Sequence, residues 1–474
     1  MTHPYDSQNK GFDLLRLRPV RALFNWRGFP YVFQAVTLLF FIGLAVLAWG
    51  HYAPAGVNAK LYAKSNLATL LIWGIWWPAM VWIAVLFGRV WCMVCPLELV
   101  SNLSERLVRR LGIRQLTLRR WATSGAVIVA LYALLQFLVA GAHINRVPAY
   151  TSLFLIGLLS MAAITGLVFK DRAFCRGFCP VGMLLGTYGR GGMLAIRPDS
   201  GKNCGTCSVK DCHSAANRHK PDARSCPSLL NPSRLDSNRD CILCGQCVKS
   251  CRSGNMRLFL RRPFAGGDVW ERFASWPVTV FVMLVSGFVT WELCAEWPKA
   301  EELFLFVPEL VNRSLGSAWL SGHIEGLWAM VMFPLLIWAL MGLGMRALGE
   351  SAGIGKLWRR IALPVAAVVS VGHMSKGLAK FVTWVGFLPH ALRDPNGTQT
   401  VVEISRGILP KPGALLSLPL VALIASTLIG LGAFYAVRVA RTSHPGSSCS
   451  ALLIKGTFAA LFLVAIVGHA LSGY

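Results

Sequence analysis

The sequence predicts an all-α polytopic membrane helix bundle of about nine transmembrane helices, with a small cysteine-rich α+β module inserted into it. Three observations predict this fold: the apolar composition, the recurrence of long apolar segments, and the concentration of cysteines in one polar stretch. Of the 474 residues, 55% are hydrophobic and only 14% are charged, whereas a soluble domain usually carries about 25% charged residues. Lipid is therefore the expected environment, and the mean hydropathy of +0.53 agrees with it.

Apolar segments long enough to cross the hydrocarbon core, which takes about 20 helical residues, recur along the chain. The beginning of the sequence, MTHPYDSQNKGFDLLRLRPV, is polar and lacks the apolar core and cleavage site of a signal peptide. We therefore expect the first span to stay in the mature protein as an anchor. The expected spans are 31–50, 67–90, 121–142, 150–170, 275–295, 324–346, 361–389, 414–438 and 451–472.

The net charge of +26 does not indicate nucleic acid binding, because Lys and Arg gather in alternate loops beside the spans. By the positive-inside rule, the arginine-rich segments 16–27 and 106–120 are expected in the cytoplasm. The segment 296–309 is rich in Glu and is expected outside. Counting spans from an inside N-terminus places 171–272 in the cytoplasm and Tyr474 at the periplasmic face of a bacterial inner membrane.

Four parts are predicted along the chain. The segment 171–272 is the part that resembles a soluble domain, but it has too few apolar residues for a sizeable core. An inorganic group is therefore expected to hold it together. The parts are a cytoplasmic N-terminal segment (1–30), a four-helix membrane unit with two Cys-Pro motifs (31–170), a cytoplasmic cysteine-rich module (171–272), and a C-terminal membrane unit of about five helices (273–474).

The strongest motif in the module is the run C-x2-C-x2-C-x3-C at 241–251. This is the bacterial ferredoxin spacing, in which three thiolates bind one [4Fe-4S] cluster and the fourth reaches the other cluster. The upstream partner is the run C-x2-C-x4-C at 204–212, followed after a gap by Cys226-Pro227. The module is therefore predicted to be ferredoxin-like, with two [4Fe-4S] clusters. The expected ligands are Cys204, Cys207, Cys212 and Cys251 for one cluster, and Cys226, Cys241, Cys244 and Cys247 for the other.

Two structural zinc sites are the alternative for these eight cysteines, since zinc also takes four thiolates. Zinc ribbons favour C-x2-C pairs separated by a longer loop, whereas three cysteines at successive short spacings fit the corners of one cluster. Disulfides are less expected, because the compartment inferred from the charge pattern is reducing.

A second cysteine pattern occurs where spans two and four end, in the phrases GRVWCMVCPLEL (88–99) and RAFCRGFCPVGM (172–183). The repetition suggests a duplicated unit of two helices that brings four cysteines together. They are expected to hold a third cluster or to act as redox-active thiols. The alternative is that they are small buried residues at helix ends that the prolines terminate. The four cysteines are Cys92, Cys95, Cys175 and Cys179, while Cys294 and Cys449 are isolated and expected to be inert.

Ionisable residues within the membrane are costly and are functional candidates. His373 lies near the middle of the seventh expected span, with Lys376 and Lys380 on the same helical face. Such histidines could ligate a b-type haem or hydrogen-bond a quinone headgroup. The alternative is that they merely lie at headgroup depth or pair with a neighbouring helix. Four further histidines fall near the outer ends of spans: His143, His323, His390 and His469.

At GRVWCMVCP, RAFCRGFCPVG and CILCGQCVKSC, the sequence resembles the NosR/NapH/CcoG type of polytopic membrane ferredoxins, over about residues 31–262. The resemblance implies a helix bundle with two Cys-Pro motifs at the cytoplasmic face, two [4Fe-4S] clusters, and electron exchange between the quinone pool and a redox partner. The chain departs from the pattern at the x4 spacing before Cys212 and at Arg252, which stands where a proline is usual. The five C-terminal spans lie beyond the resemblance.

The predicted function is that of a membrane-bound iron-sulfur electron-transfer protein, a subunit of a quinone-linked oxidoreductase system. Its expected partners are lipid, quinone or quinol, and a redox partner protein, but no nucleic acid. The alternative is an assembly or metal-handling factor that supplies electrons for maturation of another metalloenzyme. A transporter with a regulatory cluster is a third class, to which Glu292 and Glu325 near span ends would belong. The sequence offers no nucleophile with base and orienting group, no phosphate loop and no carboxylate pair, so no catalytic residue is expected.

Overall fold

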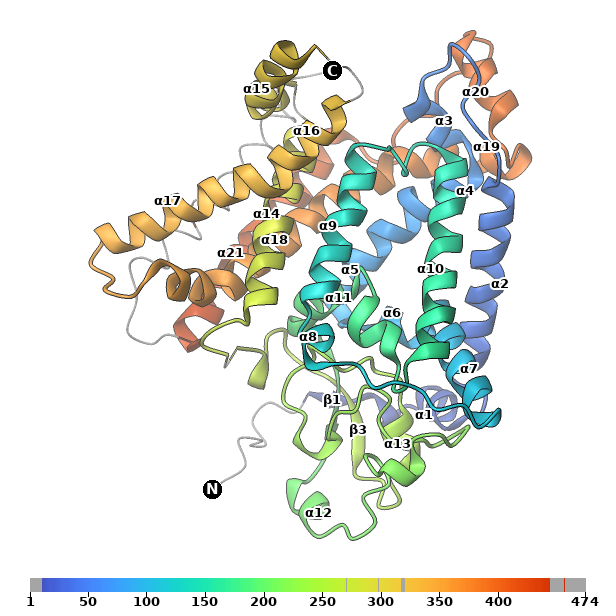
Figure 1. Ribbon diagram of the computed structural model, residues 1–474, viewed down its shortest axis with the longest axis vertical. Helices are drawn as coiled ribbons and strands as arrows, with labels where there is room; N and C mark the ends of the chain where they lie inside the picture. Colours follow the sequence, from blue (N-terminus) through green and yellow to red (C-terminus); the bar gives the residue numbers. More distant parts are fainter. Residues whose placement is uncertain (1–10, 270, 297, 317–319, 444–455, 457–474) are drawn as a thin grey trace. The chain divides into compact units, whose positions relative to one another are not determined.

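The computed structural model describes residues 11–269, 271–296, 298–316, 320–443 and 456. The described chain is largely helical and contains one small antiparallel sheet (Figure 1). It divides into two compact units: unit 1 comprises Met1–Phe41, Ile83–Ile128 and Gly157–Glu271, and unit 2 comprises Ile42–Trp82, Val129–Ile156 and Arg272–Tyr474. The helical bundle with a small α+β module confirms the predicted fold class.

Seven helical segments are long and apolar enough to cross a membrane, and they lie at seven of the nine predicted spans. A shorter apolar helix, α9 (Ala126–Ala140), occupies the position of the third predicted span. The ninth prediction, 451–472, lies outside the described residues. The seven segments are Tyr31–Ala48 (α2), Leu67–Phe87 (α4, η3 and α5), Pro148–Val168 (α10), Trp276–Cys294 (α14), Ser321–Ala347 (α16, η10 and α17), Ile354–Arg393 (α18, η11 and α19) and Pro419–Thr442 in α21.

Two strands of the sheet in unit 1 flank the module's cysteines in the sequence. β2 (Leu194–Pro198) precedes the cysteines and β3 (Met256–Leu260) follows them, and the two strands pair antiparallel. β1 (Phe12–Asp13) adds to the other edge of β3, so the N-terminal segment belongs to the same sheet. The remaining elements of unit 1 are η2 (Leu14–Arg16), α1 (Arg18–Asn25), α6 (Val90–Val94), α7 (Pro96–Arg110), α8 (Arg120–Thr123), η4 (Phe174–Phe178), α11 (Gly182–Tyr188), η5 (Gly189–Gly191), α12 (Gly201–Gly205), η6 (Ala215–Asn217), η7 (Pro232–Arg234), α13 (Gln246–Ser250) and η8 (Gly266–Val269).

The N-terminal segment also completes the apolar core of the module. Leu15, Phe24 and Phe29 are buried against a cluster that contains Cys241 and Cys247. Figure 1 shows β1, β3, α1 and α13 beside one another in this unit. The module alone has too few apolar residues for a core, and this segment supplies the missing ones.

The strand pairing constrains how often the chain crosses the membrane. Because β1 and β2 both pair with β3, the chain must cross an even number of times between residues 13 and 194. Three long spans lie in this interval. The 15-residue helix α9 must therefore be the fourth crossing. It is about 22 Å long, shorter than a hydrocarbon core of about 30 Å, so residues beyond its ends complete the crossing.

Unit 2 is built around α14 and α18, which are buried over most of their length. A Cβ added at Gly287 would lie 2.0 Å from the carbonyl oxygen of Ala329, so α14 and η10 are in direct backbone contact there. Small residues permit such close packing of helices in lipid. The elements of unit 2 not yet given are α3 (Ala59–Ser65), α15 (Pro298–Leu315) and α20 (Thr398–Ser405), and the internal bounds of the longer spans are α4 (Leu67–Thr69), η3 (Leu70–Trp76), α5 (Trp77–Phe87), α16 (Ser321–Leu327), η10 (Trp328–Met332), α17 (Phe333–Ala347), α18 (Ile354–Trp384), η11 (Val385–Phe387), α19 (Leu388–Arg393) and α21 (Leu418–Ser443).

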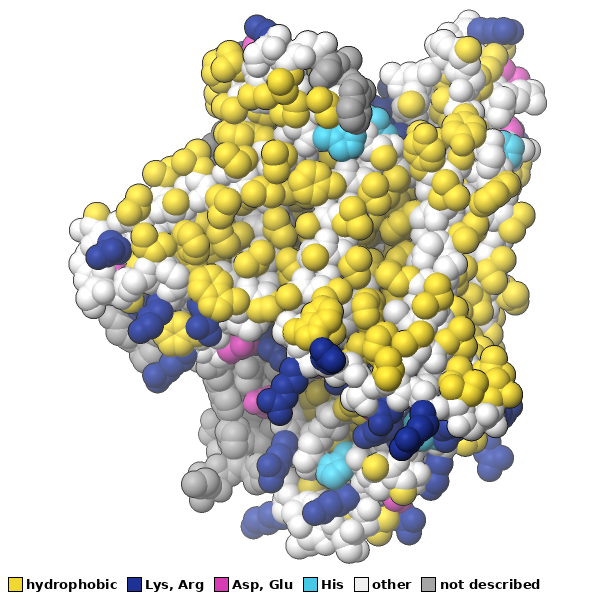
Figure 2. All heavy atoms as spheres, in the orientation of Figure 1, with side chains coloured by type: hydrophobic (Ala, Val, Ile, Leu, Met, Phe, Trp, Pro, Cys, Tyr) yellow, Lys and Arg dark blue, Asp and Glu magenta, His cyan; other side chains and the backbone are white. Residues whose placement is uncertain are grey.

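The surface of the helices is strongly apolar. Figure 2 shows hydrophobic side chains gathered over much of the helical surface. Ile164 of α10 and Leu340 of α17, for example, are each more than half exposed. Exposed apolar side chains on this scale are expected where lipid is the solvent. Lys and Arg side chains are instead exposed on the cysteine-rich module, at Lys202, Lys210, Lys220, Arg234 and Arg252.

Candidate functional site

The first set of cysteines surrounds a cavity of about 520 Å³ in the module. Asn255 forms hydrogen bonds to two of these cysteines. Its Nδ2 donates to the Sγ of Cys204 at 3.1 Å, and its backbone N–H donates to the Sγ of Cys251 at 3.3 Å. Burial and the three neighbouring thiols raise the pKa of Cys212 to about 11. The four cysteines expected from the sequence are therefore brought together, and this first set is Cys204, Cys207, Cys212 and Cys251.

The second set is more deeply buried and adjoins the first. Burial, with the thiols of Cys244 and Cys241, raises the pKa of Cys226 to about 12. Burial is also the largest cause of the raised pKa of Cys247. The other three thiols of the second set add to the shift, and Cys212 of the first set contributes least. The structure again gathers the four residues that the sequence grouped, and this second set is Cys226, Cys241, Cys244 and Cys247.

The backbone of the CILCGQC segment contains two residues in the left-handed conformation. Gly245 has φ +71° and Leu243 has φ +55°. Leu243 is nearly fully buried, and the left-handed conformation costs a non-glycine residue about 1–2 kcal/mol. Such strain persists where surrounding interactions demand it, as at a ligand loop.

The third set joins the two Cys-Pro motifs. Burial and then the other three thiols raise the pKa of Cys95 well above its usual value. Cys95 caps the N-terminus of α7, which begins at Pro96, and Cys179 follows η4 in the second motif. The predicted convergence of the two motifs is therefore present, and this third set is Cys92, Cys95, Cys175 and Cys179.

A buried carboxylate links the third set to the module. Oε1 of Glu98 lies 3.1 Å from Nε of Arg172 and 2.9 Å from Nη2 of Arg224, and Nε2 of Gln34 donates to Oε2 at 2.7 Å. Glu98 is only 1% exposed. Although burial by itself would raise it, Arg224 and Arg172 hold the pKa of Glu98 below its usual range. Sequence reasoning missed these residues, although Glu98 and Arg172 stand inside the two repeated phrases.

Two arginines place positive charge at the third set. Arg172 interacts electrostatically with Cys175 and also with Cys244 of the second set. Burial alone would lower the pKa of Arg172, but these thiols help to raise it. Arg89 lies beside Cys92 and Cys179. Its Nε is buried and has no hydrogen-bond partner among the described residues. The site is thus suited to a group of negative charge.

The zinc alternative requires several ligands around a single metal ion. No three His, Cys, Asp or Glu side chains in the described part of the chain are close enough to hold one metal ion. A zinc ion binds thiolates at about 2.3 Å, which brings them within about 4 Å of one another. A four-iron cluster binds each thiolate through a different iron and spaces them more widely. Every cysteine that the structure describes is also free of disulfides.

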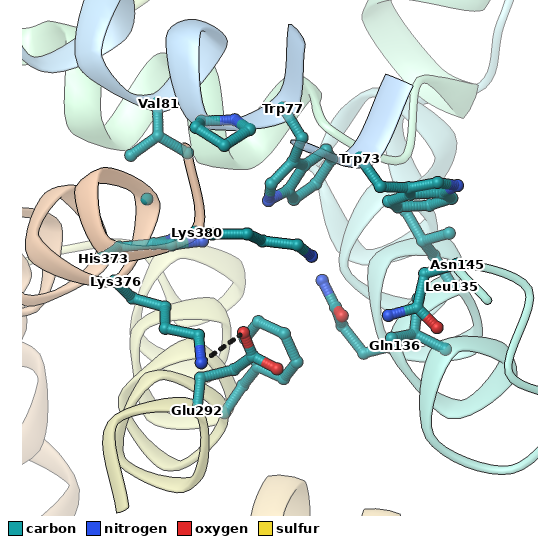
Figure 3. A pocket seen from close by; sticks show the side chains of 14 residues that line it. Trp73, Trp77, Val81, Leu135, Gln136, Asn145, Glu292, His373, Lys376 and Lys380 are labelled. Atoms are coloured by element: carbon teal, nitrogen blue, oxygen red, sulfur yellow. Dashed lines mark ion pairs between the residues drawn. The ribbon is translucent and has the colours of Figure 1, made fainter. Parts of the chain in front are cut away.

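His373 lies in unit 2 at a small cavity of about 30 Å³ that both apolar and polar side chains line. The side chain is 4% exposed, with its ring 6.3 Å from that of Trp77 and 6.2 Å from that of Phe288. Figure 3 shows Lys376 and Lys380 on the same helix, both directed to this cavity. The expected helical face is therefore present, and it lines this cavity.

The other candidate histidines that the structure describes do not line the cavity at His373. A Cβ added at Gly141 would lie 2.5 Å from the His323 ring, so this ring packs on the loop after α9. Burial and Arg146 lower the pKa of His143 in that loop, and His323 adds to the shift. The cavity is lined by no second histidine among the described residues. His390 lies in α19, and His469 lies outside the described residues.

A family model described as "4Fe-4S binding domain" matches residues 69–114 and 152–200. These two segments contain the four cysteines of the third set and no other cysteine.

Several curated relatives are similar to parts of this chain, and two of those given below are named as a ferredoxin-type protein and a putative electron transport protein. The ferredoxin-type protein NapH of Haemophilus influenzae is 29% identical over 181 residues, which cover 35% of this chain and 61% of the relative. Protein NirI of Paracoccus denitrificans is 26% identical, covering 48% of this chain and 35% of the relative. The putative electron transport protein YccM of Escherichia coli is 26% identical, covering 56% and 75%. The match to the first relative thus spans about three fifths of its length. No solved structure matches the chain significantly.

Proposed function

Over part of its length the chain belongs to the NapH/NosR type of membrane 4Fe-4S ferredoxins, and from this premise we propose that it carries electrons between the quinone pool and a redox partner protein. The observation that carries the proposal is the presence of three adjacent sets of four thiols in unit 1. When bound, [4Fe-4S] clusters supply one-electron transfer.

The first and second sets are proposed to hold one cluster each. The grouping of thiols in the fold supports the crossover assignment, in which Cys251 joins the upstream run and Cys226 joins the downstream run. Asn255 supports the first site by donating to two of its sulfurs, and hydrogen bonds to sulfur tune the potential of such clusters.

The third set is proposed to hold a third cluster rather than neutral thiols. Three buried arginines and Glu98 lie at this site, and their formal charges sum to +2. Four thiolates on an oxidised four-iron core carry a net charge of about −2, which balances them. Four protonated thiols would leave the buried cations uncompensated, which is costly. The buried Arg89 Nε without a described partner also favours an acceptor at this position.

The adjacency of the sets supports an order from first to second to third. The thiol of Cys212 in the first set acts on Cys247 in the second. Arg172 lies beside Cys244 of the second set and Cys175 of the third. These electrostatic couplings support neighbouring positions of the three sets, and electron transfer favours neighbouring centres.

The module and the N-terminal segment are proposed to lie in the bacterial cytoplasm. Strand pairing keeps both on one side of the membrane, and exposed Lys and Arg residues of both segments fit the inner face. The proposed periplasmic C-terminus, Tyr474, lies outside the described residues.

The test is anaerobic purification, iron and sulfide counting, and EPR after dithionite. About twelve irons per chain are expected for three clusters, whereas about eight would limit the protein to two. Zinc or no metal in the module would refute the proposal. A pyridine-haemochrome spectrum checks for haem, and reduction of the EPR-active centres by quinol in membranes checks the quinone link. Loss of metallation in a separate enzyme, without reduction by quinol, would favour the assembly role instead.

A further inference from the structure

Unit 2 contains a cluster of polar and charged side chains within its apolar helices. Glu292 of α14, Gln136 of α9, and His373, Lys376 and Lys380 of α18 line the cavity of about 30 Å³. Figure 3 shows these side chains converging from three helices, below the rings of Trp73 and Trp77. Ionisable groups within a membrane are costly and are retained where function needs them.

The cavity has the size and the polarity for water. A water needs about 10–15 Å³ and two or more polar partners, so the cavity holds one or two. Asn145 lines it, and its Oδ1 is buried without a hydrogen-bond partner in the described part of the chain. Lys380 extends into the cavity towards Gln136, with its ammonium 5.1 Å from the centre of the Trp384 ring. A bound water would satisfy both groups.

The charges at the cavity compensate one another closely. Nζ of Lys376 lies 3.8 Å from Oε2 of Glu292 and also pairs with Glu296. Glu292 is thus faced by Lys376, Lys380 and His373 from α18, by Tyr132 from α9, by Arg146 from the loop after α9, and by Glu296 just beyond the end of α14. With two lysines and two glutamates in balance, one added or lost proton changes the net charge of the cluster.

Polar groups continue from the cavity to the loops that follow α9 and α14. Arg146 lies near Glu292 and also near Glu301 and Glu325. Burial raises the pKa of Glu301, and Glu325 adds to the shift while Lys60 opposes it. Lys376 at the cavity also pairs with Glu296 in the loop after α14, so acids and bases continue towards this loop, and such groups can pass protons through intervening water.

In the opposite direction, Tyr132 of α9 is a buried titratable group near Gln136 and Glu292, and beyond it the described parts of α14 and α18 are mainly apolar. The α18 residues from Ile361 to Val371 are buried and apolar apart from Ser370, whose hydroxyl donates to the carbonyl of Ala367 at 2.9 Å. On α14, Ser286 and Thr290 donate to carbonyl groups of their own helix. The polar region is therefore open at one end.

We propose that unit 2 contains a one-sided proton pathway, in which Glu292, Lys380 and His373 around a water-sized cavity exchange protons with the face reached by the loops after α9 and α14. The proton leaves bulk water, is bound at this cluster and returns by the same route, and no electron is transferred in the step. We assign this face to the side of the membrane opposite the module because one helix of membrane-spanning length, α14, separates the two in the sequence. The pathway would suit a hydrogen-carrying redox partner such as quinol, but it stands without one.

The test uses the full-length protein in liposomes adsorbed on a solid-supported membrane, with rapid pH jumps. Protons that enter the membrane interior move charge, so a transient current is expected for the wild type. Glu292→Gln should lose this current. The matched control is Glu309→Gln, which removes an exposed carboxylate on α15 that pairs with Arg313 at 3.7 Å, and it should keep the current.

Two further measurements keep the test decisive. Lys380→Gln keeps the ion pairs of Lys376 with Glu292 and Glu296, and it should also lose the current. The iron content of each variant reports whether it is folded. Infrared spectra recorded across a pH titration should contain a carboxyl band that is absent in Glu292→Gln. Wild-type currents in both folded variants would overturn the proposal, as would a current that arises only from jumps on the module side. EPR and quinol reduction are measured separately, so failure of the electron-transfer role would remain distinguishable.

Discussion

Glu98 and Arg224 form a buried ion pair, with 2.9 Å between Oε1 and Nη2, although 126 positions separate them in the sequence. Glu98 follows the first Cys-Pro motif, and Arg224 precedes Cys226 of the second cysteine set. Arg172, from the second motif, binds the same carboxylate oxygen. One carboxylate therefore holds the third set of cysteines against the module.

Replacing Glu98 by Gln should destabilise unit 1 strongly. The change leaves Arg172 and Arg224 buried without their counter-charge, and removing one partner of a buried pair costs about 3–5 kcal/mol. Chemical unfolding in detergent, followed by tryptophan fluorescence, measures the loss. Glu302→Gln, at an exposed position of α15, is the control and should change the unfolding free energy by less than about 0.5 kcal/mol. Equal stability of the two variants would contradict the role of the pair.

The same carboxylate should make the stability depend on pH in the acid range. The pKa of Glu98 is lower in the folded state than in the unfolded chain, where a Glu titrates near about 4.3. Its contribution is therefore complete above that pH and is lost as the pH falls through the folded-state pKa. Unfolding free energies measured between pH 7 and pH 3 should fall less steeply in Glu98→Gln than in the wild type. Parallel curves would show that Glu98 is not responsible.

Replacing Cys244 by Ser should remove one cluster EPR signal and lower the iron content by up to about four atoms per chain. Cys244 belongs to the second set and is buried, so no solvent ligand readily replaces its thiolate. Cys294→Ser is the matched control, because Cys294 is equally buried but belongs to none of the three sets. An EPR spectrum of Cys244→Ser identical to that of the wild type would refute the ligand assignment.

Replacing Arg89 by Gln should lower the reduction potential of the third centre. The guanidinium lies beside Cys92 and Cys179, and its positive charge favours the reduced, more negative state. We expect a decrease of about 60 mV or more, which corresponds to a tenfold change in a one-electron equilibrium. EPR-monitored redox titration measures it. Arg89→Lys keeps the charge and should restore most of the potential, so an equal decrease in both variants would count against the electrostatic cause.

Replacing Lys249 by Met should release the N-terminal segment from the module. Nζ of Lys249 donates to the carbonyl groups of Trp26 at 2.6 Å and Phe29 at 2.8 Å, and it pairs with Asp222 at 2.8 Å. Limited trypsinolysis should then cut at Arg27 and neighbouring arginines faster than in the wild type. Arg252→Met, which removes a largely exposed ion pair with Asp211, is the control and should leave the rate unchanged.

The spans and the cysteine spacings could be predicted from the sequence because both are local. A run of about 20 apolar residues identifies a membrane helix wherever it packs, and seven such runs lie where they were expected. The short spacings of the 241–251 run likewise indicate a ligand loop before any fold is known. The predicted grouping of Cys251 with the upstream cysteines agrees with their common cavity, although their role as ligands remains a proposal.

Contacts between distant segments were decided by the tertiary structure alone. Nothing local in residues 12–30 predicts that they supply a strand and three core residues to a module some 200 positions away. The pairing of Glu98 with Arg172 and Arg224, and of Lys376 with Glu292 and Glu296, likewise follows from helix packing. The physical reason is that apolar length and ligand spacing act within one segment. A buried charge instead forms an ion pair with the opposite charge that the packing of the fold brings close to it.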